Sequence, residues 1–170
     1  YLNQLQIKTI TYDPLVNKLD KSEPFGYQIT ENQVDTLMMW HVLEHIPDLE
    51  SSIKVICNSV KNKGSLIIAV PNIDSFDSKL YKECWAGLDV PRHLYHFNHE
   101  SLIKFIEKHG FIYNYKKPLI FDSFYVSILS EKNRSNPFGI LIGLTMGLIS
   151  NFFALFSSNY SSSFYVFTKD

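Results

Sequence analysis

Two apolar runs and the amphipathic segment between them set the hydrophobic pattern of the first half of the chain. Residues 34–40 and 65–72 are runs of strand length with few polar positions, typical of strands buried on both faces of a parallel sheet. Between them, apolar residues recur at helical spacing, at Leu49, Ile53, Ile56 and Val60. Asp48 is suited to cap this helix and Gly64 to stop it. The pattern predicts a strand–helix–strand unit.

Further elements follow from the same periodicities. Residues 7–14 resemble a strand that ends at Asp-Pro, and residues 161–170 alternate like a closing edge strand. Residues 99–111 predict a second amphipathic helix, with Leu102, Phe105 and Ile106 on one face and Gly110 at its end. Residues 111–118 favour a strand, and residues 123–132 fit a helix or a strand. Alternating strands and helices indicate a single α/β domain over 1–170.

Composition narrows the function classes. The 170 residues are 45% hydrophobic and carry a net charge of −1, which suits one globular domain and gives no basic stripe for nucleic acid. Two cysteines without a pairing pattern predict no disulfide and a cytoplasmic location. The chain begins at Tyr1 and shows no secretory signal, so we expect that it lacks its natural N-terminal part.

The C-terminal part is free of charge from Ser135 to Thr168. An apolar helix is predicted over 137–157, and Gly139, Gly143 and Gly147 follow the four-residue spacing of close-packed membrane helices. The helix could span a membrane, pack on the sheet through its glycines, or cover an apolar acceptor. We expect peripheral membrane contact through 138–156, or a lipid-like acceptor, more than a spanning helix.

The segment His41–His45 matches the H-x-x-E-H pattern of inverted zinc proteases, with His41, Glu44 and His45 as candidate residues. A zinc site of that kind needs a long regular helix, whereas Pro47 limits any helix here to about one turn. The segment also follows directly on a predicted central strand, where α/β sheets bind small ligands. Lining of a small-molecule pocket and purely structural roles both remain open for these side chains.

Three segments resemble class I S-adenosylmethionine-dependent methyltransferases, most closely a bacterial group with W-H-x-L-E-H and P-R-H-L-x-H-F segments. They are "VDTLMMWHVLEHIPD", "KNKGSLIIAVPN" and "CWAGLDVPRHLYHFNHESLIKFIEKHGF". The resemblance implies an α/β Rossmann-like methyltransferase fold, with a mostly parallel twisted sheet, helices on both faces and an antiparallel C-terminal strand. Residues 34–40 and 65–72 would be the family's fourth and fifth strands, and residues 111–118 and 161–170 its sixth and seventh.

The resemblance also implies the cofactor S-adenosylmethionine, no metal, and a small or lipid-like acceptor. Asp13 matches the family position that binds the cofactor ribose, where one carboxylate accepts from two hydroxyls. The resemblance places the other cofactor-binding positions at Trp40, His41, Glu44 and His45. It implies acceptor binding by Arg92 and Tyr95. The candidate general bases are His41, His45, His93 and His96, of which His93 or His96 is favoured, because histidine accepts a proton near neutral pH.

The chain departs from the family pattern at its start. The family's first strand and G-x-G-x-G loop are missing from the sequence, although this loop lets the backbone approach the cofactor. One expectation is an N-terminally truncated methyltransferase. The alternatives are a catalytically inactive methyltransferase-like binding module and, more distantly, a zinc hydrolase that uses His41, Glu44 and His45. Arg92 could also simply pair with Asp89.

Overall fold

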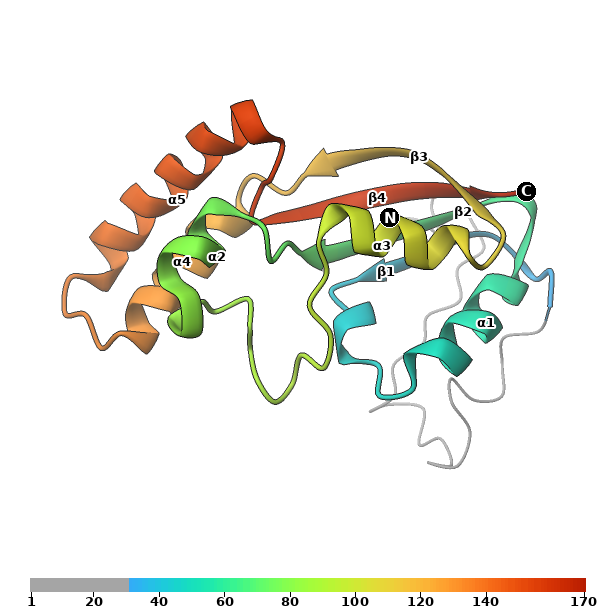
Figure 1. Cartoon of the computed structure of the whole chain (residues 1–170), viewed down its shortest axis with the longest axis horizontal. Coiled ribbons are helices and arrows are strands. Elements are labelled where there is room, and N and C mark those ends of the chain that lie inside the picture. Colours follow the sequence, from blue (N-terminus) through green and yellow to red (C-terminus); the bar gives the residue numbers. More distant parts are fainter. Residues whose placement is uncertain (1–30) are drawn as a thin grey trace, which may run out of the picture.

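A mixed four-stranded sheet organises the part of the chain that the structure describes. The computed structural model describes residues 31–170 (Figure 1). The predicted strand and sites at 7–14, including Asp13, lie outside this range. The strands are β1 (Val34–Trp40), β2 (Val60–Pro71), β3 (Phe111–Pro118) and β4 (Ser162–Lys169). Their order in the sheet is β1-β2-β4-β3.

The strand pairing confirms the predicted fold class. β1 and β2 are parallel, with Trp40 opposite Ala69. They are joined by α1 (Leu49–Ser59), as the strand–helix–strand pattern predicts. β4 runs antiparallel to both of its neighbours. The prediction of a closing edge strand at the C-terminus is wrong, because β4 lies between β2 and β3 and is buried along most of its length.

The hydrophobic core lies on one face of this sheet, under α1 and α3 (His99–Glu107) (Figure 1). Leu66 and Ile68 of β2 and Phe167 of β4 are fully buried there. The expectation that β1 is buried on both faces is wrong for the described residues. Met39 points into the core at 4% exposure, whereas Met38 is 61% exposed. The described helices α1 and α3 leave the face of Met38 uncovered.

The helix ends test the cap and stop residues that the sequence predicts. Asp48 caps α1 through a hydrogen bond from the backbone N–H of Ser51 at 3.2 Å, and Asn98 and Ser101 form a capping box on α3. The predicted stop at Gly64 is wrong, because α1 ends at Ser59 and Gly64 lies inside β2. A Cβ at Gly64 would lie 2.9 Å from the carbonyl oxygen of Asp35, so this glycine allows β1 and β2 to approach closely.

A helical hairpin projects from the end of the sheet at which β1 and β2 finish (Figure 1). Its arms are α4 (Asp122–Asn133) and α5 (Gly139–Ser157), so the apolar helix predicted over 137–157 is present. The short helices α2 (Phe76–Tyr81) and η3 (Lys82–Cys84), the latter a 3-10 turn, pack beside the hairpin. The glycines of α5 face α4, not the sheet.

Candidate active site beyond the carboxyl ends of β1 and β2

Two loops leave the sheet at the carboxyl ends of β1 and β2, and they are hydrogen-bonded to each other. The loop after β1 contains the 3-10 turn η2 (Leu43–His45), and the segment after β2 runs through α2 and η3 to residue 98. The backbone N–H of Leu94 donates to the carbonyl of Glu44 at 2.8 Å. The ring of His45 bonds to the carbonyl of Arg92 at 3.0 Å. The two motifs identified in the sequence therefore form one unit.

A cavity of about 730 Å³ lies between these loops and α4. Acidic, basic and aromatic side chains share its wall. Among the lining residues are His41, His45, Trp85, Asp89, Arg92, His93, Asp122 and Tyr125. Its volume is in the range of small-molecule sites, and its place at the carboxyl ends of two parallel strands is where open α/β sheets bind ligands.

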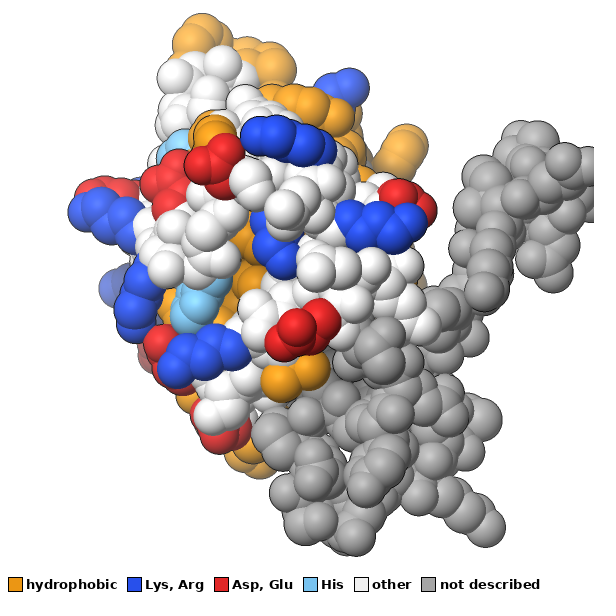
Figure 2. All heavy atoms as spheres, turned by 90° about the vertical axis from the view of Figure 1, so that its right-hand side faces the viewer, with side chains coloured by type: hydrophobic (Ala, Val, Ile, Leu, Met, Phe, Trp, Pro, Cys, Tyr) orange, Lys and Arg blue, Asp and Glu red, His pale blue; other side chains and the backbone are white. Residues whose placement is uncertain are grey.

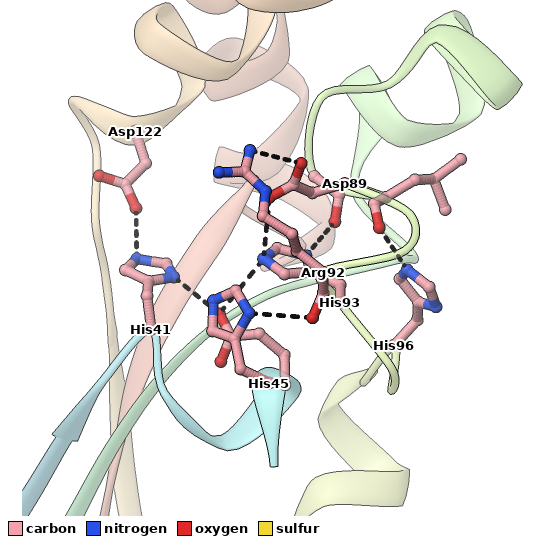
Figure 3. A network of polar contacts seen from close by, with 10 residues as sticks. His41, His45, Asp89, Arg92, His93, His96 and Asp122 are labelled. Carbon is pink, nitrogen blue, oxygen red and sulfur yellow. Dashed lines mark hydrogen bonds and ion pairs between the residues drawn. The ribbon is translucent and has the colours of Figure 1, made fainter. Parts of the chain in front are cut away.

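His41 is held between two carboxylates (Figure 3). Its Nδ1 lies 3.2 Å from Oε1 of Glu44, and its Nε2 lies 3.1 Å from Oδ2 of Asp122. Partial burial of the ring favours the neutral form, but the two hydrogen bonds and the negative charges of Glu44 and Asp122 outweigh it and raise the pKa of His41 to about 9. His41 is therefore a cation at neutral pH and is poorly suited to act as a general base.

His93 has one ring nitrogen anchored and the other facing two carboxylates. Its Nδ1 lies 2.8 Å from the carbonyl oxygen of Gly87. Because a carbonyl only accepts, Nδ1 carries the proton and Nε2 holds the lone pair of the neutral ring. Nε2 lies 4.0 Å from Glu44 and 3.8 Å from Asp89. The side chain is only 10% exposed, so His93 offers a basic nitrogen in a largely desolvated wall of the cavity.

The other predicted acceptor-side residues lie farther from the cavity or on its rim. His96 is exposed and bonds to the carbonyl of Leu88 at 2.9 Å. Tyr95 packs beside Phe97 and donates its hydroxyl to the carbonyl of Pro47. Neither His96 nor Tyr95 lines the cavity. Arg92 lines the cavity but is 76% exposed and pairs with Asp89 at 2.7 Å. This ion pair is the alternative role that the sequence left open for Arg92.

The residues predicted on the cofactor side also differ in position. Trp40 is 49% exposed at the end of β1, and its ring lies 5.9 Å from that of Phe164. Glu44 is 1% exposed and is the shared neighbour of His41 and His93. Its Oε2 makes no hydrogen bond to any described residue. Asp13 lies outside the described residues.

Sequence reasoning missed several cavity residues, among them Asp122, Tyr125 and Trp85. Asp122 and Tyr125 come from the start of α4, far along the chain from the motifs. Trp85 is buried, and its Nε1 donates to Asp77 at 2.8 Å. No local pattern marks Asp122. The lone acid at the start of an otherwise apolar segment was the only signal that could have pointed to it.

Within residues 31–170, one group of side chains has the spacing to hold a metal ion. The ligand atoms of Glu44, His45 and His93 lie within 4.8 Å of one another. His41 is not in this group. The pattern expected of a zinc protease also lacks its regular helix, since Leu43–His45 is a single 3-10 turn and His41 precedes it with a φ of 52°.

The fold is shared with solved proteins of low sequence identity. A possible histamine N-methyltransferase from Thermotoga maritima is 15% identical, with a TM-score of 0.56 over 85% of this chain and 60% of that one. Phosphoethanolamine N-methyltransferase 2 from Haemonchus contortus, solved with S-adenosyl-L-methionine, is 18% identical, with a TM-score of 0.50 over 84% and 35%. The cyclase SpnF is 12% identical, with a TM-score of 0.53 over 86% and 53%.

These structures show the fold alone, and the cyclase illustrates that one fold carries more than one kind of chemistry. The chain spans between 35% and 60% of their lengths. No curated protein sequence matches it significantly. The sequence model of a family described as "Methyltransferase domain" matches residues 1–114, about two thirds of the chain, and includes both loops of the candidate site. The chain therefore belongs to this family of methyltransferase domains.

Proposed function

We propose that the protein transfers a methyl group from S-adenosylmethionine to a small or lipid-like acceptor bound in the cavity between the two loops and α4. The observation that carries the proposal is His93. It presents a basic nitrogen in a buried wall of this cavity, at the edge of the sheet where the family's cofactor would lie. Membership of the methyltransferase family supports the cofactor assignment.

The cofactor would bind next to the carboxyl end of β1. Asp13 would accept hydrogen bonds from its ribose, and the half-exposed ring of Trp40 offers an apolar surface beside it. When bound, the cofactor supplies a methyl group on a positively charged sulfur that leaves as a neutral thioether. The protein then has to position the acceptor in line with that methyl group and keep water away.

His93 would remove the proton that the acceptor loses. As the bond from the acceptor oxygen or nitrogen to the methyl carbon forms and the sulfur–carbon bond breaks, the acceptor's proton passes to Nε2 of His93. The resulting imidazolium would be stabilised by Glu44 and Asp89, whose carboxylates lie 4.0 and 3.8 Å away. The bond from Nδ1 to Gly87 keeps the ring in the orientation this step requires.

His41 would have an electrostatic and positioning role. Its charge offsets those of the lining residue Asp122 and of the buried Glu44, and its two hydrogen bonds fix both carboxylates. The lining residue Tyr125, which is 65% exposed, supplies an apolar ring and a hydroxyl on the opposite side of the cavity. This mixture of charged and aromatic groups suits an acceptor with both a polar and an apolar part.

A labelling experiment tests the proposal and does not require the acceptor to be identified first. The protein is incubated with methyl-tritiated S-adenosylmethionine and a cell extract separated into water-soluble small molecules and lipids. We expect label in one fraction, its loss with His93→Gln, and its retention with His96→Gln, which alters a histidine outside the cavity. Equal labelling by both variants would contradict the role of His93. No labelling, with cofactor binding intact, would favour an inactive binding module.

A further inference from the structure

In α5 the small residues are buried and the large apolar residues are exposed, which is the reverse of a helix that packs in the core of a soluble protein. Its buried positions are small residues, at Gly139, Gly143, Gly147, Ser150 and Ala154. Its large apolar side chains face outward. Leu141, Leu148 and Leu155, spaced by seven residues, are 70%, 62% and 67% exposed. At this spacing they form one line along the helix. Only 22% of the apolar helix is buried within the protein.

Packing inside the protein does not account for these outward side chains. A Cβ at Gly143 would lie 2.5 Å from the Cα of Ile128, and one at Gly147 would lie 2.7 Å from the Cα of Phe124. The hairpin is therefore held by close backbone approach, the mode common between helices in membranes. Phe152 and Phe156 of α5 are exposed as well, and so are Phe138 directly before α5 and Phe121 directly before α4. A large exposed apolar surface of this kind marks an interaction site.

Basic side chains lie on α4 and on the elements that pack beside the hairpin. Lys79, Lys82, Lys132 and Arg134 are exposed on or directly after α2, η3 and α4. Of the acids on these elements, Asp77 and Glu131 are buried and Asp122 pairs with His41. Glu83 is the one exposed acid among them. The opposite end of the molecule carries side chains of both signs, interspersed (Figure 2). An apolar helix face accompanied by such basic side chains is complementary to an anionic bilayer surface.

We propose that the α4–α5 hairpin docks on an anionic lipid bilayer, with the leucine line of α5 inserted at the boundary between headgroups and acyl chains. A spanning arrangement fits less well, because α4, whose last turn carries Glu131 and Lys132, would have to cross together with α5. A second copy fits less well too. In a two-fold dimer the basic side chains of one copy would face those of the other.

The docked orientation bears on the acceptor. Tyr125, Leu129 and Lys132 occupy one face of α4 and line the cavity, while Phe124, Ile128 and Glu131 face α5. Docking of α5 would therefore bring the α4 wall of the cavity close to the bilayer, within reach of a lipid-like acceptor in the membrane. This consequence for the acceptor rests on the proposed methyl transfer, whereas the docking itself does not.

Vesicle co-sedimentation tests the docking directly. The protein is mixed with vesicles of phosphatidylcholine alone or with added phosphatidylglycerol. We expect sedimentation with the anionic vesicles, and an affinity lower by about tenfold or more for the double variant Leu148→Asp, Leu155→Asp. Lys79→Glu together with Lys82→Glu should reduce binding to anionic vesicles selectively. Ile112→Asp is the matched control, because Ile112 is 54% exposed on β3, away from the hairpin.

Unchanged sedimentation of the leucine variant would overturn the proposal, as would absence of binding to either kind of vesicle. Analytical ultracentrifugation tests the alternative that a second copy of the protein covers this surface. A dimer that the leucine variant abolishes, with no vesicle binding, would assign the surface to a second copy. Titration with S-adenosylhomocysteine, run in parallel, separates loss of docking from loss of cofactor binding.

Discussion

His41 and Asp122 are 81 positions apart in the sequence, yet Nε2 of His41 lies 3.1 Å from Oδ2 of Asp122. This contact joins the carboxyl end of β1 to the first turn of α4 (Figure 3). It closes one side of the cavity and connects the hairpin to the motif after β1. The ion pair thus couples the part of the site assigned to the cofactor with the part assigned to the acceptor.

The first prediction concerns the pH dependence of this contact. The folded-state pKa of His41, about 9, lies above the ordinary value of 6.5. The stabilisation is therefore fully present below pH 6.5 and is lost as the pH rises through about 9. We expect Asp122→Asn to lower the free energy of unfolding at about pH 6, by no more than about 3 kcal/mol, and to have a much smaller effect at about pH 9.5.

Urea unfolding of both proteins at the two pH values measures this difference. Asp35→Asn is the control, because Asp35 is 85% exposed and pairs with Lys61 on the surface. An equal effect of Asp122→Asn at both pH values would show that His41 is not the charged partner.

The second prediction concerns the close approach of α4 and α5. In Gly143→Ala the new methyl group would overlap the backbone of Ile128, so the helices must separate. We expect a loss of about 1–3 kcal/mol in the free energy of unfolding. Gly139→Ala is the comparison, because a Cβ there would lie 3.2 Å from the Cβ of Glu131, a tight contact without backbone overlap, and we expect a smaller loss. Thermal unfolding followed by circular dichroism compares them. If Gly143→Ala proved as stable as Gly139→Ala, the close helix packing would be wrong.

The third prediction concerns Asp77, which anchors the hairpin beneath α5. Its carboxylate is fully buried and accepts hydrogen bonds from Nε1 of Trp85 at 2.8 Å, from Ser150 at 2.8 Å and from Ser161 at 2.7 Å. An asparagine has one acceptor oxygen and would present its amide group to a donor. We expect Asp77→Asn to cost about 1–3 kcal/mol of stability.

Urea unfolding measures this loss, and the fluorescence of Trp85 reports whether the local contact changes. Asp74→Asn changes a nearby, less buried acid and should leave both properties nearly unchanged. An Asp77→Asn protein as stable as the Asp74→Asn protein would mean that the buried carboxylate does not hold the hairpin.

Local signals in the sequence predicted local structure well. The N-cap at Asp48 depends on residues three positions away, and the apolar spacing of Leu102 and Ile106 is enough to place α3. Gly64 misled because glycine ends helices and also allows close strand packing, and only the position of β1 beside it decides between the two. The family resemblance predicted that the last strand runs antiparallel, as it does, whereas alternation alone made this strand an edge strand.

The candidate site was predictable only in part, because its parts come from distant segments. The two motifs identified His41 and His93, and both line the cavity. The sequence could not separate His93 from His96, since that choice depends on which ring faces inward. It also gave no sign that Asp122 would hold His41 in the charged form. Likewise, the apolar pattern of α5 did not show that its large side chains face outward.

The measurement that tests the central claim most directly is a calorimetric titration of the protein with S-adenosylhomocysteine, alongside Asp13→Ala and the surface control Asp35→Ala. If the site after β1 binds the methyltransferase cofactor, the unmodified protein and Asp35→Ala will bind it with similar affinity, and Asp13→Ala will bind it much more weakly. Absence of binding by the folded, unmodified protein would contradict the account, as would equal affinities for all three proteins.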